Sequence, residues 1–401
     1  MIKRSDFPIL TKKIVGRPLV YFDNAATTQK PLSVIKATSE YYSKFNSNVH
    51  RGINPLAEEA TKRYEESRDI IAAFISAHRE EVIFTRGATE SINLVARSWG
   101  EANLKKSDTL VLSVAEHHSN IVPWLQLQIK IGFKILYIPI KADGRLDFVA
   151  AKKIILQPGV KFLGLSYASN VLGIVNPIKK IVKLAQAHSI ITLIDATQVL
   201  AHQLVNVRDL GCSFLVFSGH KMLGPTGTGV LYGKRELLAA MPPFLGGGDM
   251  ISTVSLDSFT PNVLPYKFEA GTPNIAGVIG LAAACRYLSN LGWSEIRAKE
   301  KELKQYFLDK IKTLKFIKIL GTAGPKLPIF SLIVEGIHPH DAADLLGQEG
   351  IILRAGQHCA EPLHNHLGYS ASLRASLNFY NTKREIDFFI RKLIELKKKF
   401  Y

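Results

Sequence analysis

Short apolar segments alternate with helical patterns through most of the chain, and this alternation limits the folds open to it. The segments predicted to be buried strands are 81–85, 109–114, 133–140, 161–168, 190–195 and 212–219. Helical patterns such as "ATESINLVARSW" (88–99) and "IKKIVKLAQAH" (178–188) lie between several of them. Such alternation indicates an α/β fold with a mostly parallel sheet that helices cover on both faces.

The pattern changes after Gly233. Residues 241–274 form a long stretch rich in Gly and Pro, which in a compact domain is usually functional or an interface arm. An apolar helix is predicted over 277–291, and strands are predicted near 328–336 and 350–356. We therefore expect a second, smaller domain from about residue 290 onward.

The composition predicts where in the cell the protein is found and which partners it has. No segment approaches the ~18 consecutive apolar residues of a membrane helix, and no signal peptide is evident, so we expect no membrane association. Three cysteines in 401 residues favour a reducing, cytoplasmic location over a disulfide scaffold. The net charge of +17 is compatible with nucleic-acid binding, but the basic residues are scattered without an aromatic stripe, which favours a Lys-rich solvated surface and no nucleic-acid partner.

Polar side chains with chemical potential follow several of the predicted strands, where open α/β sheets bind their ligands. After 81–85, a glycine turn precedes Ala88 and Thr89, whose backbone N–H groups suit a phosphate, although an ordinary helix cap by Thr89 explains them equally well. After 109–114 come His117 and His118, which fit metal ligands, a ring stacked on a cofactor, or plain loop residues.

Two oppositely charged residues follow the next strands. Asp195 ends 190–195 and suits either a helix N-cap or the partner of a cationic group on a cofactor. Lys221 stands between 212–219 and a glycine-rich loop, where a lysine of lowered pKa can form a Schiff base with a carbonyl cofactor. Ser218 and His220 beside it are suited to hold a phosphate, and neither a dinucleotide motif nor a P-loop is present.

Together these residues match the needs of pyridoxal 5'-phosphate (PLP). The aldehyde requires the lysine, the pyridine nitrogen requires an acid that keeps it protonated, and the phosphate requires N–H and hydroxyl donors. The strand ends therefore predict a PLP site.

The motifs also resemble those of a known family over nearly the whole chain and in the same order. They are "NVHRG", "TRGATESINLVA", "AEHHSNIVPW", "SNVLG", "SGHKMLGPTGTGVLYG", "FEAGTPN", "RAGQHCAEPL" and "LRASLNFYNT". The chain resembles the group II cysteine desulfurases, of the class V aminotransferase family of fold-type I PLP enzymes. The resemblance implies a large PLP-binding domain over 20–289 with a mostly parallel seven-stranded sheet. It implies a smaller α+β domain from 1–19 and 290–401 that carries the catalytic cysteine.

The resemblance also implies a role for individual residues. Lys221 binds the cofactor covalently, His117 stacks on its ring and Asp195 pairs with the pyridine nitrogen. The other implied cofactor contacts are Gln198, Asn170, Ala88, Thr89, Ser218, His220 and, on the phosphate of a neighbouring subunit, Thr272. The implied substrate-binding residues are Arg374, Asn170, Arg354 and, with Arg51 at the entrance, His50. A homodimer follows from the role of Thr272.

Cys359 is the implied sulfur-accepting nucleophile, and Lys221 the implied base that takes the α-proton of L-cysteine. Cys359 lies in a polar, glycine-containing loop that we expect to be mobile or solvent-facing, with Arg354 and His358 nearby to favour its thiolate. Cys212 and Cys285 are expected to be small core residues. A metal site formed by Cys359 and its neighbouring histidines lacks the spacing of a closed zinc site, so none is predicted.

The sequence departs from the family at two motifs. "DATQ" stands in place of the usual "DGAQ", which suggests a packing adjustment only, and Gln357 makes "GQHCA" of the usual "GHHCA". The glutamine version is more similar to the cysteine sulfinate desulfinase branch than to the SufS-like branch.

The activity that the resemblance implies is L-cysteine desulfuration, with a SufE-like acceptor protein and a role in iron–sulfur cluster assembly or other sulfur metabolism. Cysteine sulfinate desulfinase and selenocysteine lyase activities remain alternatives, as does a non-enzymatic basic binding protein on this fold.

Overall fold

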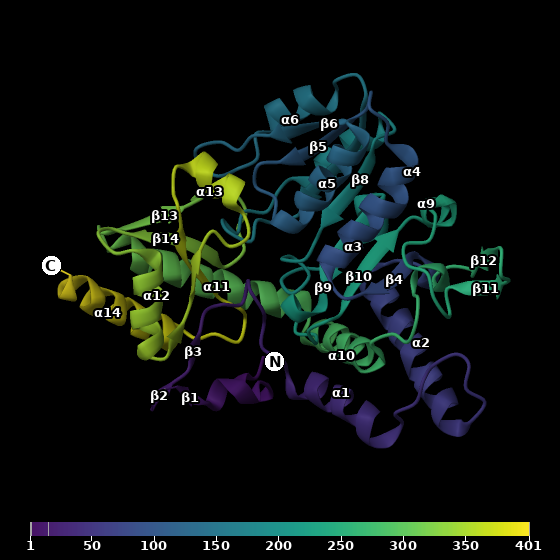
Figure 1. Ribbon diagram of the computed structural model, residues 1–401. Coiled ribbons are helices and arrows are strands. Elements are labelled where there is room, and N and C mark those ends of the chain that lie inside the picture. The colour runs from purple at the N-terminus through teal and green to yellow at the C-terminus, as the bar shows by residue number, and fades with distance from the viewer. Residues whose placement is uncertain (1, 15, 401) are drawn as a thin grey trace.

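The computed structural model describes residues 2–14 and 16–400. Figure 1 shows a larger part, in which a twisted sheet lies between helices, and a smaller part that contains the C-terminal helix α14. Residues 1, 15 and 401, which fall in the predicted smaller domain, lie outside this description.

The central sheet confirms the predicted α/β fold. It has seven strands in the order β4, β10, β9, β8, β7, β5, β6. Only β10 is antiparallel to its neighbours, β4 and β9. The strands are β4 (Val82–Thr85), β5 (Thr109–Ser113), β6 (Lys134–Ile138), β7 (Val160–Ser166), β8 (Ile191–Asp195), β9 (Phe214–Ser218) and β10 (Gly229–Gly233). The six strands predicted from the apolar segments are therefore β4 to β9.

Helices cover both faces of this sheet because alternate strand residues point to opposite sides. Val82 and Phe84 of β4 join a hydrophobic cluster with α1, α2, α6, α7 and α10, whereas Ile83 joins a second cluster with α3, α5 and α9. The helices of this part are α1 (Leu32–Lys44), α2 (Pro55–Ile75), α3 (Ala88–Leu94), α4 (Glu101–Asn103), α5 (Val122–Ile131), α6 (Phe148–Ile155), α7 (Ile178–Gln186), α8 (Val207–Leu210), α9 (Arg235–Ala240) and α10 (Ile275–Leu291). A π-helix (Val95–Gly100) joins α3 to α4. Short 3-10 turns span Arg4–Asp6, Pro8–Thr11, Arg79–Glu81, His118–Asn120, Gly219–Lys221 and Tyr266–Phe268.

Helix α7 illustrates how the sequence produces this layer. Its buried side chains are Ile178, Ile181, Val182 and Ala185, whose spacing places them on one face of a helix. The lysines between them lie outside that face, and the helix ends close to where the 178–188 pattern predicted.

The long Gly- and Pro-rich stretch contains a hairpin of β11 (Ile251–Val254) and β12 (Phe259–Pro261). Figure 1 shows this hairpin projecting from the body of the molecule. Its tip carries fully exposed Leu256, and Val254 and Phe259 are exposed as well. Exposed apolar side chains on a projecting hairpin are typical of an interaction surface.

The C-terminal part has its own sheet, in the order β13, β14, β17, β16, and its own hydrophobic cluster. Its elements are α11 (Trp293–Lys312), β13 (Ile317–Leu320), β14 (Ile329–Val334), α12 (Pro339–Gln348), β15 (Ile351–Ile352), β16 (Arg354–Gly356), α13 (Glu361–Leu367), β17 (Ser372–Ser376) and α14 (Lys383–Lys399).

Val20 and Phe22 join this smaller part, whereas Phe7, Leu10 and Leu19 belong to the hydrophobic cluster of the larger part. After the two-stranded β1 (Lys13–Ile14) and β2 (Arg17–Pro18), strand β3 (Val20–Tyr21) pairs in parallel with β15. Residues on both sides of position 20 therefore contact both parts, and the predicted division into 20–289 and 1–19 with 290–401 stays a prediction.

Among the described residues, no single helix has the length and apolar composition needed to cross a membrane. Helices α10 and α11 meet that test only as a pair, with a bend of 81° between them.

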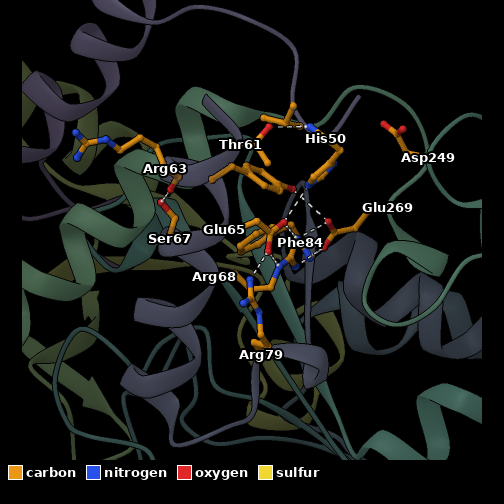
Figure 2. Close-up of polar contacts among 12 residues, drawn as sticks. His50, Thr61, Arg63, Glu65, Ser67, Arg68, Arg79, Phe84, Asp249 and Glu269 are labelled. Atoms are coloured by element: carbon orange, nitrogen blue, oxygen red, sulfur yellow. Dashed lines mark hydrogen bonds and ion pairs between the residues drawn. The ribbon is translucent and has the colours of Figure 1, made fainter. Parts of the chain in front are cut away.

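A buried arginine ties the long stretch before α10 to the sheet (Figure 2). Arg68 of α2 has no exposed side-chain surface, and its two Nη atoms each lie 2.8 Å from a carboxylate oxygen of Glu269. Its guanidinium also lies 4.3 Å from the centre of the Phe84 ring, and the Phe84 N–H donates to Glu269 at 2.8 Å. Because both charges are buried, each depends on the other for its solvation.

We predict that Glu269→Ala lowers the free energy of unfolding by about 3 kcal/mol, because buried Arg68 loses two short hydrogen bonds to a carboxylate and, among the described residues, keeps only Glu65, at 3.1 Å, as an ionic partner. Urea unfolding followed by circular dichroism measures this loss. Glu59→Ala is the matched control, since Glu59 pairs with half-exposed Arg63 at 2.7 Å, and an exposed pair contributes about 1 kcal/mol or less. Equal losses in the two variants would contradict the assignment of Arg68 and Glu269 as a buried structural pair.

Candidate active site

One cavity of about 310 Å³ opens at the carboxyl ends of the parallel strands. It is the place where the topology of an open α/β sheet puts a ligand. Its lining comes from both parts of the chain and comprises Ala25, Ala26, Ala88, Thr89, His117, Ser119, Ser166, Ala168, Asn170, Asp195, Thr197, Gln198, Ser218, His220, Lys221, Arg354, His358, Cys359 and Arg374.

Most residues predicted for the site line this cavity together. They are Ala88, Thr89, His117, Asn170, Asp195, Gln198, Ser218, His220, Lys221, Arg354, Cys359 and Arg374. The roles assigned to them stay predictions, but the fold brings them to one place. His50 and Thr272 do not line the cavity.

One end of the cavity is formed where β4 turns into α3 beside the end of β9. The Ala88 N–H donates to the Ser218 hydroxyl at 2.9 Å, and Thr89 and His220 stand at the same end. Gly229 allows this close approach, since a Cβ there would lie 2.3 Å from the Cα of Gly87. Backbone N–H groups at a helix start, together with a hydroxyl, are donors suited to a phosphate.

Lys221 follows β9, and burial lowers its pKa to about 8, although the Asp195 carboxylate acts in the opposite direction. A lysine with this pKa is neutral in a larger fraction near pH 7 than an ordinary lysine. The amine is therefore better suited to react with an aldehyde.

Asp195 ends β8, and burial raises the pKa of its carboxyl group while the hydrogen bonds from Thr197 oppose that effect. The Thr197 N–H donates to Asp195 Oδ1 at 2.9 Å. The Gln198 side chain is held nearby by donating to the Ala25 carbonyl at 3.0 Å. A cation beside Asp195 would stabilise its charged form, and a protonated pyridine ring is such a cation.

His117 presents a neutral ring to the cavity. Burial, with the nearby Lys221 charge, lowers its pKa to about 3. Its Nδ1 accepts from the Ser119 N–H at 3.1 Å and lies 2.8 Å from the Ser119 hydroxyl. An uncharged, anchored imidazole can stack on an aromatic cofactor without bringing a second positive charge.

Cys359 is the exposed cysteine, whereas Cys212 and Cys285 are buried. The predicted contrast is confirmed, and burial raises the pKa of the Cys212 thiol to about 12 and raises that of Cys285 as well. The thiolate form that reacts with sulfur is therefore suppressed at the two core positions.

The loop that carries Cys359 is anchored. The Cys359 carbonyl accepts from the His118 N–H at 2.8 Å, and the His358 carbonyl accepts from the Asn170 side chain at 2.7 Å. His358 and Cys359 have φ angles of 54° and 56°, a left-handed conformation that non-glycine residues hold only when their surroundings impose it. The loop is solvent-facing, as expected, but these contacts hold it in place.

The expectation that His358 adds positive charge beside the thiolate is wrong. Its ring is buried, Nε2 lies 3.0 Å from the Ser372 hydroxyl, and burial lowers its pKa to about 2. His358 is therefore neutral near pH 7. Arg354, which is half-exposed, and Arg374 line the same cavity as Cys359 and supply positive charge there.

Arg374 has a nearly buried side chain on β17 and donates to the Asn170 carbonyl at 3.0 Å. It also contacts Asp23 at 3.2 Å. Its Nε is buried and has no hydrogen-bond partner among the described residues. The Arg374 residue lines the cavity, and a guanidinium group there suits a ligand carboxylate.

Several residues of this site were not predicted from the sequence. Asp23 contacts both arginines, Ala25 and Thr197 hold the predicted Gln198 and Asp195, and Ser119 anchors His117. The acid in "YFDNAATT", directly after a short apolar run, was the available signal for Asp23.

His50 and Thr272 lie elsewhere. Figure 2 shows His50 in the charged cluster around Glu65 and Glu269, and its Nε2 lies 3.0 Å from Glu65. Thr272 is exposed in the stretch before α10, and Arg51 pairs with Asp249 at 2.7 Å. Neither His50 nor Thr272 reaches the cavity of its own chain.

The donors of the cavity fit PLP. An amine of lowered pKa, a buried carboxylate, a neutral ring and a set of N–H and hydroxyl donors surround one space, as the aldehyde, pyridine ring and phosphate require. Among the described residues, no group of three or more His, Cys, Asp or Glu side chains is placed to hold a metal ion.

Known proteins match the chain over nearly its full length. A probable cysteine desulfurase from Xylella fastidiosa is 44% identical over 395 residues, covering 98% of this chain and 95% of the relative. A probable cysteine desulfurase from Halalkalibacterium halodurans is 46% identical over 395 residues, covering 98% of this chain and 97% of the relative. The apo structure of a cysteine desulfurase from Thermococcus onnurineus has a TM-score of 0.94 at 39% identity, covering 99% of this chain and 97% of the other.

The family model for aminotransferase class-V matches residues 20–389, which include both the sheet that supports Lys221 and the loop that carries Cys359. The chain belongs to the aminotransferase class-V family of PLP-dependent enzymes, as the predicted cofactor and fold required.

Proposed function

We propose that this protein is a PLP-dependent cysteine desulfurase, which converts L-cysteine to L-alanine and passes the sulfur to Cys359 and then to an acceptor. The observation that carries the proposal is an exposed cysteine, held by an anchored loop, on the same cavity as Lys221 and Asp195. The activity named for the full-length relatives supports it.

Each residue has a task that its surroundings suit. Bound PLP supplies an electron sink for negative charge that develops at the substrate α-carbon. Arg374 binds the α-carboxylate, since its guanidinium group lines the cavity and such groups pair well with carboxylates. Lys221, with its pKa near 8, takes the α-proton as general base.

Cys359 performs the sulfur transfer. Its thiolate attacks the sulfur atom of the substrate, so a sulfur–sulfur bond forms while the substrate carbon–sulfur bond breaks. The electron pair of the broken bond stays on carbon, which takes up a proton before alanine leaves. The outer sulfur of the Cys359 persulfide then moves to an acceptor thiol, which the exposure of Cys359 permits.

The proposal includes a homodimer. His50 and Thr272 lie outside the cavity of their own chain, and the hairpin of β11 and β12 carries exposed apolar side chains. A second copy that brings Thr272 and His50 to the neighbouring cavity would account for both observations. We further propose a group II enzyme of the cytoplasm that works with a SufE-like acceptor in iron–sulfur cluster assembly or other sulfur metabolism.

A second candidate is cysteine sulfinate desulfinase, with selenocysteine lyase beside it. These substrates carry better leaving groups and do not need a nucleophilic thiol. Gln357 in "GQHCA" favours this candidate, because that version of the motif is more similar to the cysteine sulfinate desulfinase branch.

Lys221→Ala is expected to abolish the absorbance of covalently bound PLP and to lower alanine release from L-cysteine at least about 100-fold, because it removes both the amine and the general base. Visible absorbance and an alanine assay measure the two effects. A colourless wild-type protein that binds no PLP would instead support the non-enzymatic binding protein.

Cys359→Ala is expected to reduce alanine release from L-cysteine to background while most of the release from L-cysteine sulfinate and L-selenocysteine remains. The reason is that only the thiol substrate requires the Cys359 nucleophile. Cys285→Ala, a buried cysteine far from solvent, is the matched control and should keep all three activities. Equal loss on all three substrates in Cys359→Ala would refute the nucleophilic role.

The rate at which cofactor-free protein takes up PLP is expected to rise with pH, with a midpoint near pH 8 and a plateau by about pH 9, because only the neutral Lys221 amine attacks the aldehyde. With the ordinary lysine pKa of 10.5 the rise would continue through pH 9.5. Stopped-flow absorbance measures the profile. Asp195→Asn should move its midpoint to lower pH, since the Asp195 carboxylate raises the pKa of Lys221.

A further inference from the structure

Two arginines face each other across neighbouring strands at the wall of the cavity. Arg354 of β16 is the register partner of Arg374 of β17. Like charges directly opposite each other on paired strands are destabilising, so this arrangement requires a counter-charge. Both side chains line the cavity, which makes the arrangement part of the site.

Asp23 provides that counter-charge. Its Oδ2 accepts from Arg354 Nη2 at 2.9 Å and from Arg354 Nε at 3.1 Å, and its Oδ1 lies 3.2 Å from Arg374 Nη2. Asp23 is itself buried, with 6% of its surface exposed, and its backbone pairs with Ser376 beside the end of β17. One carboxylate is thus shared by two guanidinium groups.

The net charge of Arg354, Arg374 and Asp23 affects which substrate the cavity binds best. Two guanidinium cations and one carboxylate leave a single net positive charge, which matches the single α-carboxylate of L-cysteine with its neutral thiol. L-Cysteine sulfinate brings a second anion on its side chain. While Asp23 occupies Arg354, that second anion meets a guanidinium that is already paired.

Arg354 is also the member of the group that can change partner. Half of its side-chain surface is exposed, whereas that of Arg374 is only 2% exposed and is further held by the Asn170 carbonyl. Without the Asp23 charge, Arg354 would remain at the cavity wall as an unpaired cation.

We propose that Asp23 is a specificity-determining positioning residue, which by pairing with Arg354 makes the cavity favour L-cysteine over the doubly anionic L-cysteine sulfinate. Asp23 acts through the arginines and does not contact the reacting atoms. The inference rests on the proposed function, since it names the substrate that the same site prefers.

The test compares kcat/KM for alanine release from the two substrates in the holoenzyme. Asp23→Asn should raise the ratio of sulfinate to cysteine at least about fivefold, the scale of one charge in a half-exposed pair. Arg354→Gln should lower the same ratio, because it removes a positive charge and leaves Asp23 in place. The double variant restores the original net charge and should return the ratio toward that of the wild type.

Two controls separate specificity from stability. Glu300→Gln neutralises another buried carboxylate, which lies 2.7 Å from His202 and outside the cavity, and it should leave the ratio unchanged. Asp23→Glu keeps the charge and should keep a ratio close to that of the wild type. The absorbance of bound PLP confirms that each variant is folded and loaded.

If the ion pair were purely structural, Asp23→Asn and Arg354→Gln would either shift the sulfinate-to-cysteine ratio in the same direction or leave it unchanged. Either result overturns the inference. If Asp23→Asn does not fold, Arg354→Gln decides, since an unchanged or raised ratio also overturns it. If the wild-type holoenzyme releases no alanine from L-cysteine, the proposed function fails. If it does so while the ratios stay unmoved, only the role of Asp23 fails.

Discussion

The site depends on the burial of two opposite charges, Lys221 and Asp195, at the ends of neighbouring strands. β8 and β9 pair in parallel, so both ends reach the same edge of the sheet. Burial raises the pKa of the Asp195 carboxyl and lowers that of the Lys221 amine, which disfavours the charged form of each. PLP offers a pyridine ring to the acid and an aldehyde to the amine, so binding the cofactor satisfies both groups at once.

The smaller part of the chain completes this site. β16 and β17 bring Arg354 and Arg374 to the cavity, and the loop between β16 and α13 brings Cys359. Contacts from His118 and Asn170, both in loops that follow strands of the large sheet, hold the Cys359 loop in a left-handed backbone conformation. The two parts therefore line one cavity, to which the larger part contributes Lys221 and Asp195 and the smaller part contributes Cys359.

Much of the fold and site was predictable because the signals are local. A buried strand is visible as an apolar run, and the polar residue after it marks the ligand edge, which is how Asp195 and Lys221 were found. The contrast between Cys359 and the core cysteines likewise followed from their neighbours in sequence. The behaviour of His358 was not predictable, since burial and the nearby charges of Arg374 and Arg354, which lie on strands β17 and β16, lower its pKa.

The sequence alone determined the class of fold, because an apolar strand pattern is a property of a short segment. It also determined the chemistry, because a lysine, an aspartate and a cysteine in a polar loop can each be recognised from their neighbours in sequence. The tertiary structure alone decided how the charges are shared. Asp23 and Arg354 are 331 residues apart in the chain and meet only because β3 pairs with β15 beside the second sheet. An ion pair of this kind has no local pattern, since its partners are selected by strand pairing between distant segments, and only the folded chain shows that one carboxylate serves two arginines at the cavity wall.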